Sequence, residues 1–205
     1  MMKRLAGLLS ILSAFACGCA AVPEPRYYRV PLDIPTVFED SLQSYGESLR
    51  IARFDAIVPL RQDSIVTYQE KSTLIDYSSC DFWESSPSEI VSRQLAHAFR
   101  ACQLLSRVDR HPVRPPAKYL INGKIQRFNQ LQTKHGLYGE VALEVQFIDQ
   151  GRQQILWTTT IRELKKAEGD DSEAAVLAVS EALGQCIVQI LQQVKQGTAY
   201  HEARW

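Results

Sequence analysis

The sequence predicts an α+β fold: a mixed, largely antiparallel β-sheet with two long amphipathic helices packed on one face. Three successive segments, near 118–130, 138–149 and 153–164, alternate apolar and polar residues, which is typical of strands with one buried and one wet face. Two other segments, from 87 to about 105 and from about 172 past 194, carry apolar residues at helical spacing. These helices are expected to cover the apolar face of the strands.

Shorter β segments precede the first helix. Residues 27–31 are aromatic and β-branched, and "SLRIARFDA" at 48–56 alternates in the manner of a strand. Residues 32–47 are expected to form a loop. The stretch "SIVTYQEKSTLIDY" at 64–77 contains two β-rich runs around a polar centre, which predicts a hairpin.

The first helix has a clear start signal. Ser86 is placed to cap it, Pro87 to occupy its first position, and Glu89 to complete a capping box. After this helix, "RHPVRPPAKY" at 110–119 is expected to be a proline-punctuated connector. Residues 197–205 are expected to be a loose C-terminal tail, which leaves 27–196 as the folded domain.

Composition narrows the functional classes. The chain has 205 residues, of which 45% are hydrophobic and 22% charged, as in one ordinary globular domain with an appendage. Lysine plus arginine and aspartate plus glutamate number 23 each. Because the charges balance, no basic surface for nucleic acid is indicated, and we expect no nucleic-acid partner.

The N-terminus predicts export. A charged start, a short apolar run and small residues over 1–18 are the three parts of a signal peptide. The apolar run is shorter than the roughly 20 residues that a spanning helix needs. A buried N-terminal helix is the alternative, but the run has no polar face at the helical period.

Two cysteines follow the apolar run, and either suits the pattern of a bacterial lipoprotein, in which a small residue precedes a lipid-bearing cysteine. We favour Cys19 over Cys17 because the residues before Cys19 include Gly18 and Ala16, whereas Phe15 lies close to Cys17. An export signal without lipid remains the alternative. Ala20, where an inner-membrane retention signal often has Asp, favours the bacterial outer membrane on its periplasmic side.

The lipidated tether would be short. It comprises residues 19–26, contains two prolines and reaches at most about 25 Å from Cys19 when fully extended. The domain is therefore expected to lie close to the membrane that holds the lipid.

No motif indicates catalysis, metal or cofactor. The remaining cysteines, Cys80, Cys102 and Cys186, lack ligand spacing, and we interpret them as small buried hydrophobes. A Cys102–Cys186 disulfide is a second reading if the two helices pack side by side. The four histidines form no HExxH pattern, and neither a GxSxG elbow nor a phosphate-binding loop is present. We expect a protein that is not an enzyme.

Four aromatic residues are candidate interface anchors. They are Tyr27, Tyr28, Phe82 and Trp83, and such residues are enriched among interface hot spots. For Trp83 the structural alternative is that it staples the helix to the sheet. Of the two tyrosines, one is expected to pack inward and the other outward. The connection at 129–139 is a further candidate hairpin tip for a partner.

Several stretches together resemble the ABC-type transport auxiliary lipoproteins, a family that includes the paraquat-inducible protein C type of component. The stretches are "RYYRV" soon after the exported cysteine, "LRIARFDA", "SIVTYQ", "DYSSCDFWESSPSEIVSRQLAHAF", and "YLINGKIQRFNQ" followed by "GEVALEVQFID". The similarity covers most of residues 19–194. The chain has Ser78, Ser79 and Ser86 where the family more often has tyrosine and proline.

The resemblance implies a non-catalytic docking component of an ABC-type lipid transport system. Its expected partner is a periplasmic substrate-binding component of the mammalian-cell-entry (Mce) type, and a homo-oligomer is left open. The alternative is a structural envelope lipoprotein or an outer-membrane assembly factor. Direct lipid binding between sheet and helices is a third reading, which a large apolar cavity would support.

Overall fold

The computed structural model describes residues 23–31, 45–110 and 117–202. The predicted signal peptide, Cys17 and Cys19 lie outside these residues. The strands are β1 Arg26–Tyr28, β2 Tyr45–Ile51, β3 Asp55–Ala56, β4 Ser64–Gln69, β5 Ile75–Trp83, β6 Leu105–Arg110, β7 Tyr119–Thr133, β8 Gly136–Asp149 and β9 Gln154–Lys166. The helices are α2 Pro87–Ala101 and α3 Ser172–Glu202, with a 3-10 turn η2 at Val58–Leu60.

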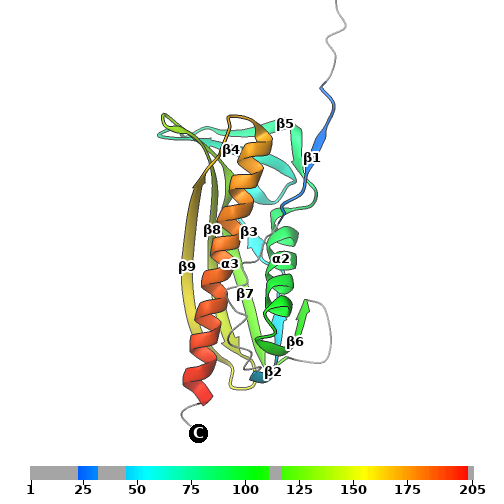
Figure 1. The fold of residues 1–205 in the computed structure, drawn as a ribbon, viewed down its shortest axis with the longest axis vertical. Helices are drawn as coiled ribbons and strands as arrows, with labels where there is room; N and C mark the ends of the chain where they lie inside the picture. The colour runs from blue at the N-terminus through cyan, green and yellow to red at the C-terminus, as the bar shows by residue number, and fades with distance from the viewer. Residues whose placement is uncertain (1–22, 32–44, 111–116, 203–205) are drawn as a thin grey trace, which may run out of the picture.

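Strand β7 is the central strand of the sheet (Figure 1). One of its edges pairs with β8, which in turn pairs with β9, and both pairings are antiparallel. The other edge pairs in succession with β2, β3 and β4, all parallel to β7. Outside these, β6 lies on β2, while β5 and then β1 lie beyond β4. The fold is therefore α+β with a mixed sheet, as the sequence predicts.

The expectation of a largely antiparallel sheet is wrong in part. Of the eight pairings among the described strands, five are parallel: β1–β5, β2–β6, β2–β7, β3–β7 and β4–β7. Four of these pairings join a strand before α2 to β6 or β7 after it, so α2 is the crossover connection that parallel strands require. The fifth, β1–β5, joins two strands that both precede α2. Only the long meander β7–β8–β9 and the hairpin β4–β5 are antiparallel.

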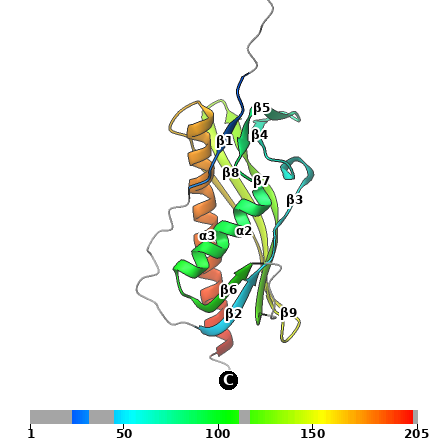
Figure 2. The same cartoon turned by 90° about the vertical axis from the view of Figure 1, so that its right-hand side faces the viewer.

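The sheet curls into a half-barrel, so it offers the helices no single flat face (Figures 1 and 2). Helix α3 packs along β8 and β9, whereas α2 packs mainly on β6, with further contacts to β2, β3 and β7. Register shifts between Ile125 and Arg127 and between Phe147 and Ile148 mark irregularities in the long strands. Such bulges increase strand twist and bend, which accounts for the curl.

The core lies between the concave side of the sheet and the two helices. Its largest buried side chains include Trp83, Phe54, Phe99, Phe128 and Phe147. Residues Ser172–Gln196 of α3 are long and apolar enough to cross a bilayer by composition, but 61% of the most apolar window is buried inside the protein. That burial is what the core helix of a globular domain requires.

Two details before and within α2 differ from the prediction. The segment 48–56 is not one strand, because its backbone leaves β7 after Ala52 and the amide of Phe54 donates to Ser92 Oγ of α2, at 3.0 Å. The helix starts at Pro87 after Ser86 as predicted, but no capping box forms. Instead, the Glu89 carboxylate accepts a hydrogen bond from Arg110 of β6.

Strand β6 and the end of α3 were also not anticipated. Leu105–Arg110 forms a strand on the open edge of β2, with Leu105 and Val108 buried, where the sequence predicts the end of a helix and a connector. The α3 backbone runs to Glu202, so helix replaces the first part of the loose tail expected at 197–205.

The backbone of α3 lies so close to Gly139 of β8 that no side chain fits between them. A Cβ at Gly139 would lie 2.2 Å from the backbone nitrogen of Val179 and 2.4 Å from the carbonyl carbon of Ala178. Because backbone atoms cannot move aside, Gly139→Ala is expected to lower the free energy of unfolding by about 1–3 kcal/mol through overpacking. Urea denaturation measures this.

The matched control is Gly151→Ala in the β8–β9 turn, where a Cβ would meet a side-chain oxygen of Asp149 at 3.3 Å. This change is expected to alter stability by no more than about 0.5 kcal/mol. Equal effects of the two substitutions would contradict the tight helix–sheet contact.

Candidate functional site at the first strand

Strand β1 is the point where the predicted tether enters the domain. It lies parallel to β5, with Arg26 opposite Asp81, Tyr27 opposite Phe82 and Tyr28 opposite Trp83. The amide of Glu84 donates to the Tyr28 carbonyl at 2.8 Å. The first strand is therefore an integral edge of the sheet.

The chain after β1 is fastened as well. The Val30 side chain is fully buried in the core, and its carbonyl accepts a hydrogen bond from Gln94 Nε2 of α2 at 2.9 Å. On the outer side, Arg29 lies 3.7 Å from the Glu84 carboxylate. Backbone pairing, a buried apolar side chain and a helix contact together hold residues 26–30 on the domain.

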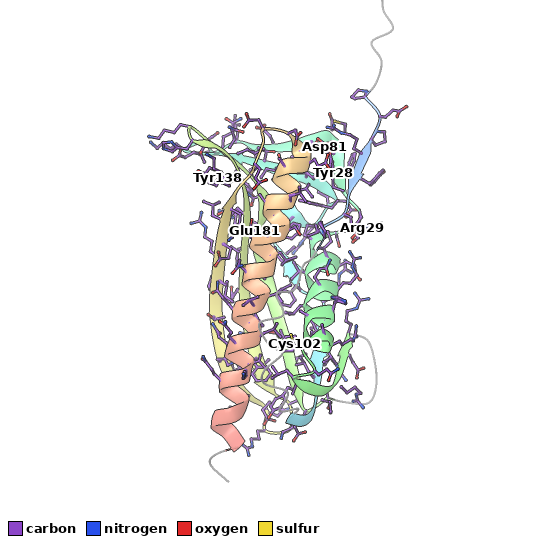
Figure 3. All side chains as sticks on the ribbon, viewed as in Figure 1. Tyr28, Arg29, Asp81, Cys102, Tyr138 and Glu181 are labelled. Atoms are coloured by element: carbon purple, nitrogen blue, oxygen red, sulfur yellow. The ribbon has the colours of Figure 1, made fainter. Side chains whose placement is uncertain are left out.

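A buried carboxylate joins β1 to the start of α3. Asp81 is 6% exposed, and its Oδ1 accepts from Arg26 Nε at 2.7 Å while its Oδ2 accepts from Ser172 Oγ at 2.8 Å. The Asp81 amide in turn donates to Ser78 Oγ at 2.9 Å. Figure 3 shows Asp81 beside Tyr28, at the end of the molecule where α3 begins. One side chain thus links β1, β5 and α3.

The electrostatics of Asp81 favour its charged form. Burial by itself would raise the pKa of the carboxyl, but hydrogen bonds from Arg26 and Ser172 and the charge of Arg26 outweigh burial and hold the pKa below its ordinary value. For Tyr28 the opposite holds, because burial and then the nearby negative charge of Asp81 raise its pKa. Asp81 is thus an anion that the folded state stabilises.

Among the predicted interface residues, Tyr27 and Phe82 form the accessible pair. Tyr27 is 69% exposed, and its ring stacks on that of Phe82 with a centroid distance of 5.6 Å and an interplanar angle of 29°. Tyr28 is half-buried and packs against the core, so the two tyrosines point in opposite directions, as alternation predicts. We call Tyr27 and Phe82 the aromatic pair.

Trp83 lies elsewhere. Its side chain is 1% exposed and meets Phe128 edge to face, with centroids 5.0 Å apart and an interplanar angle of 69°. This position favours the structural alternative, in which Trp83 is a packing residue of the core. The lipid attachment candidate Cys19 lies outside the described residues.

The three remaining cysteines are free thiols. Cys186 is buried and Cys102 half-buried, and no Cys102–Cys186 disulfide forms even though α2 and α3 lie in contact. Burial raises the pKa of Cys186 to about 12, with the charge of Glu163 contributing. A thiol with this pKa carries almost no thiolate at neutral pH, so Cys186 acts as a small apolar core residue.

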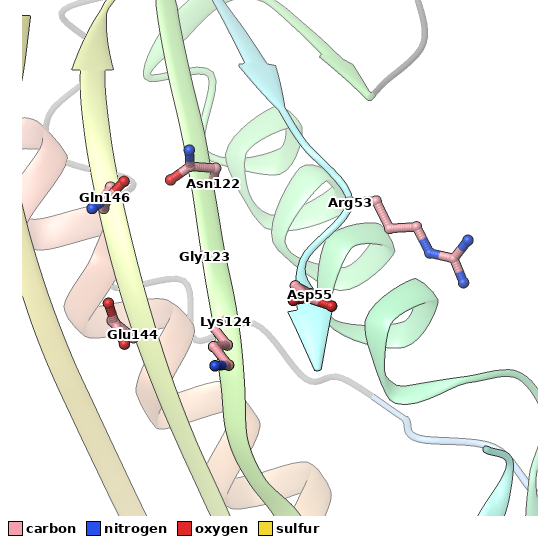
Figure 4. A pocket seen from close by; sticks show the side chains of 7 residues that line it. All are labelled: Arg53, Asp55, Asn122, Gly123, Lys124, Glu144 and Gln146. Atoms are coloured by element: carbon pink, nitrogen blue, oxygen red, sulfur yellow. The ribbon is translucent and has the colours of Figure 1, made fainter. Parts of the chain in front are cut away.

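A polar pocket lies beside the break between β2 and β3. Its volume is about 340 Å³. Figure 4 shows the residues that line it, most of them on β7 and β8. Its lining contains two basic and two acidic side chains together with two amides and a glycine, so its charges balance and no large apolar side chain lines it. The lining residues are Arg53, Asp55, Asn122, Gly123, Lys124, Glu144 and Gln146.

A second buried carboxylate stabilises the convex face of the sheet. Glu140 is 2% exposed, and its oxygens accept hydrogen bonds from Arg162 at 2.8 Å and from Asn129 at 3.2 Å. Arg127 Nε lies 3.8 Å from the same carboxylate. This cluster ties β7, β8 and β9 together and leaves Glu140 no free oxygen for a substrate.

Among residues 23–31, 45–110 and 117–202, no group of three His, Cys, Asp or Glu side chains could hold a metal ion.

The contacts that the sequence did not point to are those of Asp81 with Arg26 and Ser172. One signal was available: Asp81 lies two residues before Trp83, so strand alternation places both on the same side of β5. Its partners, 55 and 91 residues away, could not be read from spacing.

The Asp81 contacts predict a pH-dependent stability. Asp81→Asn is expected to lower the free energy of unfolding at pH 7 by about 1–3 kcal/mol, because Arg26 and Ser172 lose a charged acceptor. Since the folded pKa lies below the unfolded value of about 3.9, the advantage of wild type is complete well above that pH. It is then lost as the pH falls through the folded pKa.

Urea denaturation of wild type and variant between pH 7 and pH 3 measures the difference. Asp76→Asn is the control on the same strand, because Asp76 is exposed and only accepts a hydrogen bond from Gln69 at 3.1 Å. A wild-type advantage that stays constant down to pH 3, or one that Asp76→Asn equally removes, would contradict the role of Asp81.

Known structures share this arrangement of sheet and helices. A protein from Xanthomonas campestris superposes with a TM-score of 0.75 at 12% identity, over 87% of this chain and 99% of that one. An uncharacterized protein gives 0.65 at 14% identity, over 83% and 99%, respectively. A hypothetical protein from Chlamydia trachomatis gives 0.51 at 8% identity, over 73% and 96%. At these identities the likeness concerns the fold alone.

No curated protein matches the chain. A family model does: that of the ABC-type transport auxiliary lipoprotein component matches residues 33–191, most of the chain and nearly all of the described domain. The match begins just after β1 and ends within α3, so it includes α2, the first part of α3 and every strand of the curled sheet except β1. By this match the chain belongs to the family of ABC-type transport auxiliary lipoprotein components.

Proposed function

We propose that the protein is an outer-membrane-anchored periplasmic lipoprotein that serves as a non-catalytic docking component of an ABC-type, Mce-like lipid transport system. Family membership supports an envelope lipoprotein associated with an ABC transporter. The observation that carries the proposal is the integration of β1 into the sheet only seven residues after Cys19. A lipid on that cysteine would hold the folded domain itself at the bilayer.

The anchoring part of the proposal rests on Cys19. Acyl chains on this residue, each contributing about 0.8 kcal/mol per buried methylene, would retain the domain firmly on a membrane. Because β1 is held by Asp81 and by the buried side chain of Val30, the distance to the membrane is set by residues 20–25 alone. The proposed site is the periplasmic side of the outer membrane.

The docking part rests on the aromatic pair. Tyr27 and Phe82 stack on each other at the edge of the sheet, and β1 is fixed by backbone hydrogen bonds and by Asp81. Rings that are already held in place lose little conformational entropy on binding, which is how exposed aromatic residues become hot spots. The proposed partner is a periplasmic substrate-binding component of the mammalian-cell-entry type.

A pull-down from native membranes tests this function. The tagged protein is solubilised in detergent, its partners are identified by mass spectrometry, and the mass of its N-terminal peptide is read from the same sample. Recovery of a substrate-binding component with an acylated Cys19 is the expected result. Recovery of barrels or cell-wall proteins instead would favour the structural or assembly role, and an unmodified N-terminus would refute the anchor.

The aromatic pair generates a specific prediction. Phe82→Ser removes the ring beneath Tyr27 and is expected to lower recovery of the partner by roughly tenfold, the effect of one hot-spot residue. Ile155→Ser is the matched control, because Ile155 is 53% exposed and lies in β9, away from β1. Unchanged recovery with Phe82→Ser, or an equal loss with Ile155→Ser, would exclude the aromatic pair as the docking site.

A further inference from the structure

Two hairpin tips lie side by side at the end of the molecule where β1 enters the domain. They are the β4–β5 tip at residues 70–74 and the β7–β8 tip at residues 133–136, and we call them the paired tips. The amide of Glu70 donates to the Gln132 carbonyl at 2.8 Å, which bonds one hairpin to the other. Figure 1 shows both tips projecting beyond the sheet, at the end opposite the end of α3.

The paired tips are shaped by their own hydrogen bonds. In the first tip the Leu74 amide donates to Ser72 Oγ at 3.0 Å. In the second the His135 amide donates to Thr133 Oγ1 at 3.0 Å, and Thr133 Oγ1 donates to the Gly136 carbonyl at 3.0 Å. The tips therefore present a defined surface.

That surface is apolar at one point and basic around it. Leu74 is 67% exposed and lies outside the buried core of the domain. Lys71 and Lys134 are exposed in the two tips, and Lys166 at the end of β9 lies beside Gly136. Within the tips themselves, Lys71 and Lys134 outnumber the acidic residue Glu70 by two to one.

We propose that the paired tips rest on the lipid surface of the membrane that anchors the chain, with Leu74 in the interfacial layer and the three lysines on lipid phosphates. This inference rests on the lipid anchor of the proposed function. An apolar side chain surrounded by lysines is the pattern of interfacial membrane contacts. The contact determines which end of the domain faces the membrane.

The tether supplies the geometric argument. From Cys19 to the start of β1 the chain reaches at most about 25 Å, and β1 enters at the same end of the molecule as the tips in both views (Figures 1 and 2). Helix α3, with 31 residues, extends about 46 Å away from that end. A tether of this length brings the tips to the bilayer while the far end of the domain points into the periplasm.

Lysine footprinting of the full-length protein tests the contact. The protein is reconstituted into vesicles of phosphatidylethanolamine and phosphatidylglycerol and, separately, into detergent micelles. A membrane-impermeant acylating reagent then labels lysines, and mass spectrometry follows the rates. Labelling of Lys71, Lys134 and Lys166 is expected to slow by at least about fivefold in vesicles. Lys124, exposed on the middle of β7, is the internal control and is expected to keep its rate.

Variants sharpen the test. Leu74→Asp places a charge in the interfacial layer and is expected to restore fast labelling of Lys134 in vesicles, whereas Ile155→Asp at the opposite end of the sheet is expected to leave it slow. If the three lysines label equally fast in vesicles and micelles while the N-terminal peptide is acylated, the inference is overturned and the anchor stands. Slow labelling of the three lysines in both vesicles and micelles also overturns the inference, because bound protein, and not lipid, would then cover the tips. An unacylated N-terminal peptide overturns both the inference and the anchor.

Discussion

The buried carboxylate of Asp81 is the interaction on which the placement of the N-terminal strand depends. A carboxylate inside a protein costs several kcal/mol unless its charge is compensated. Arg26 of β1 and Ser172 of α3 supply that compensation in the folded state. If β1 left the sheet edge, Asp81 would lose its ion-pair partner and Val30 its place in the core. The first strand is thus coupled to the stability of the whole domain.

This coupling means that the domain is held through its N-terminal strand. Because β1 is integral, whatever holds the chain upstream also holds the curled sheet in a defined position. One end of β7 leads into the β7–β8 tip, which is bonded to the β4–β5 tip, and its other end lies where β2, β6 and the β8–β9 turn meet (Figure 1). An elongated domain attached at one end suits a component that must place a partner at a set distance from a membrane.

Periodicity predicted the fold class and the long elements because burial on one face imposes periods of 2 and 3.6 on strands and helices. The strands β7, β8 and β9 and the starts of both helices follow their sequence patterns closely. The parallel or antiparallel direction of the strands could not be predicted from periodicity, because it depends on which edge of β7 each segment pairs with. The short strand β6 was missed because its six residues bury only Leu105 and Val108 on the sheet.

The candidate site was predictable only in part. Aromatic composition pointed to Tyr27 and Phe82, but the same criterion included Trp83, which alternation along β5 turns into the core. The pairing of Asp81 with Arg26 joins residues 55 positions apart, and only tertiary structure brings them together. The capping box does not form, and the Glu89 carboxylate pairs with Arg110 instead, a residue of the strand that was not anticipated.

Neutron reflectometry on the acylated, full-length protein at a supported bilayer tests most directly whether the domain is fastened to the membrane through β1. The expected profile is one protein layer about 50 Å thick, a thickness set by the length of α3, that begins within about 25 Å of the lipid headgroups. A protein layer separated from the headgroups by a wider layer of water, or no adsorbed layer at all, would contradict it.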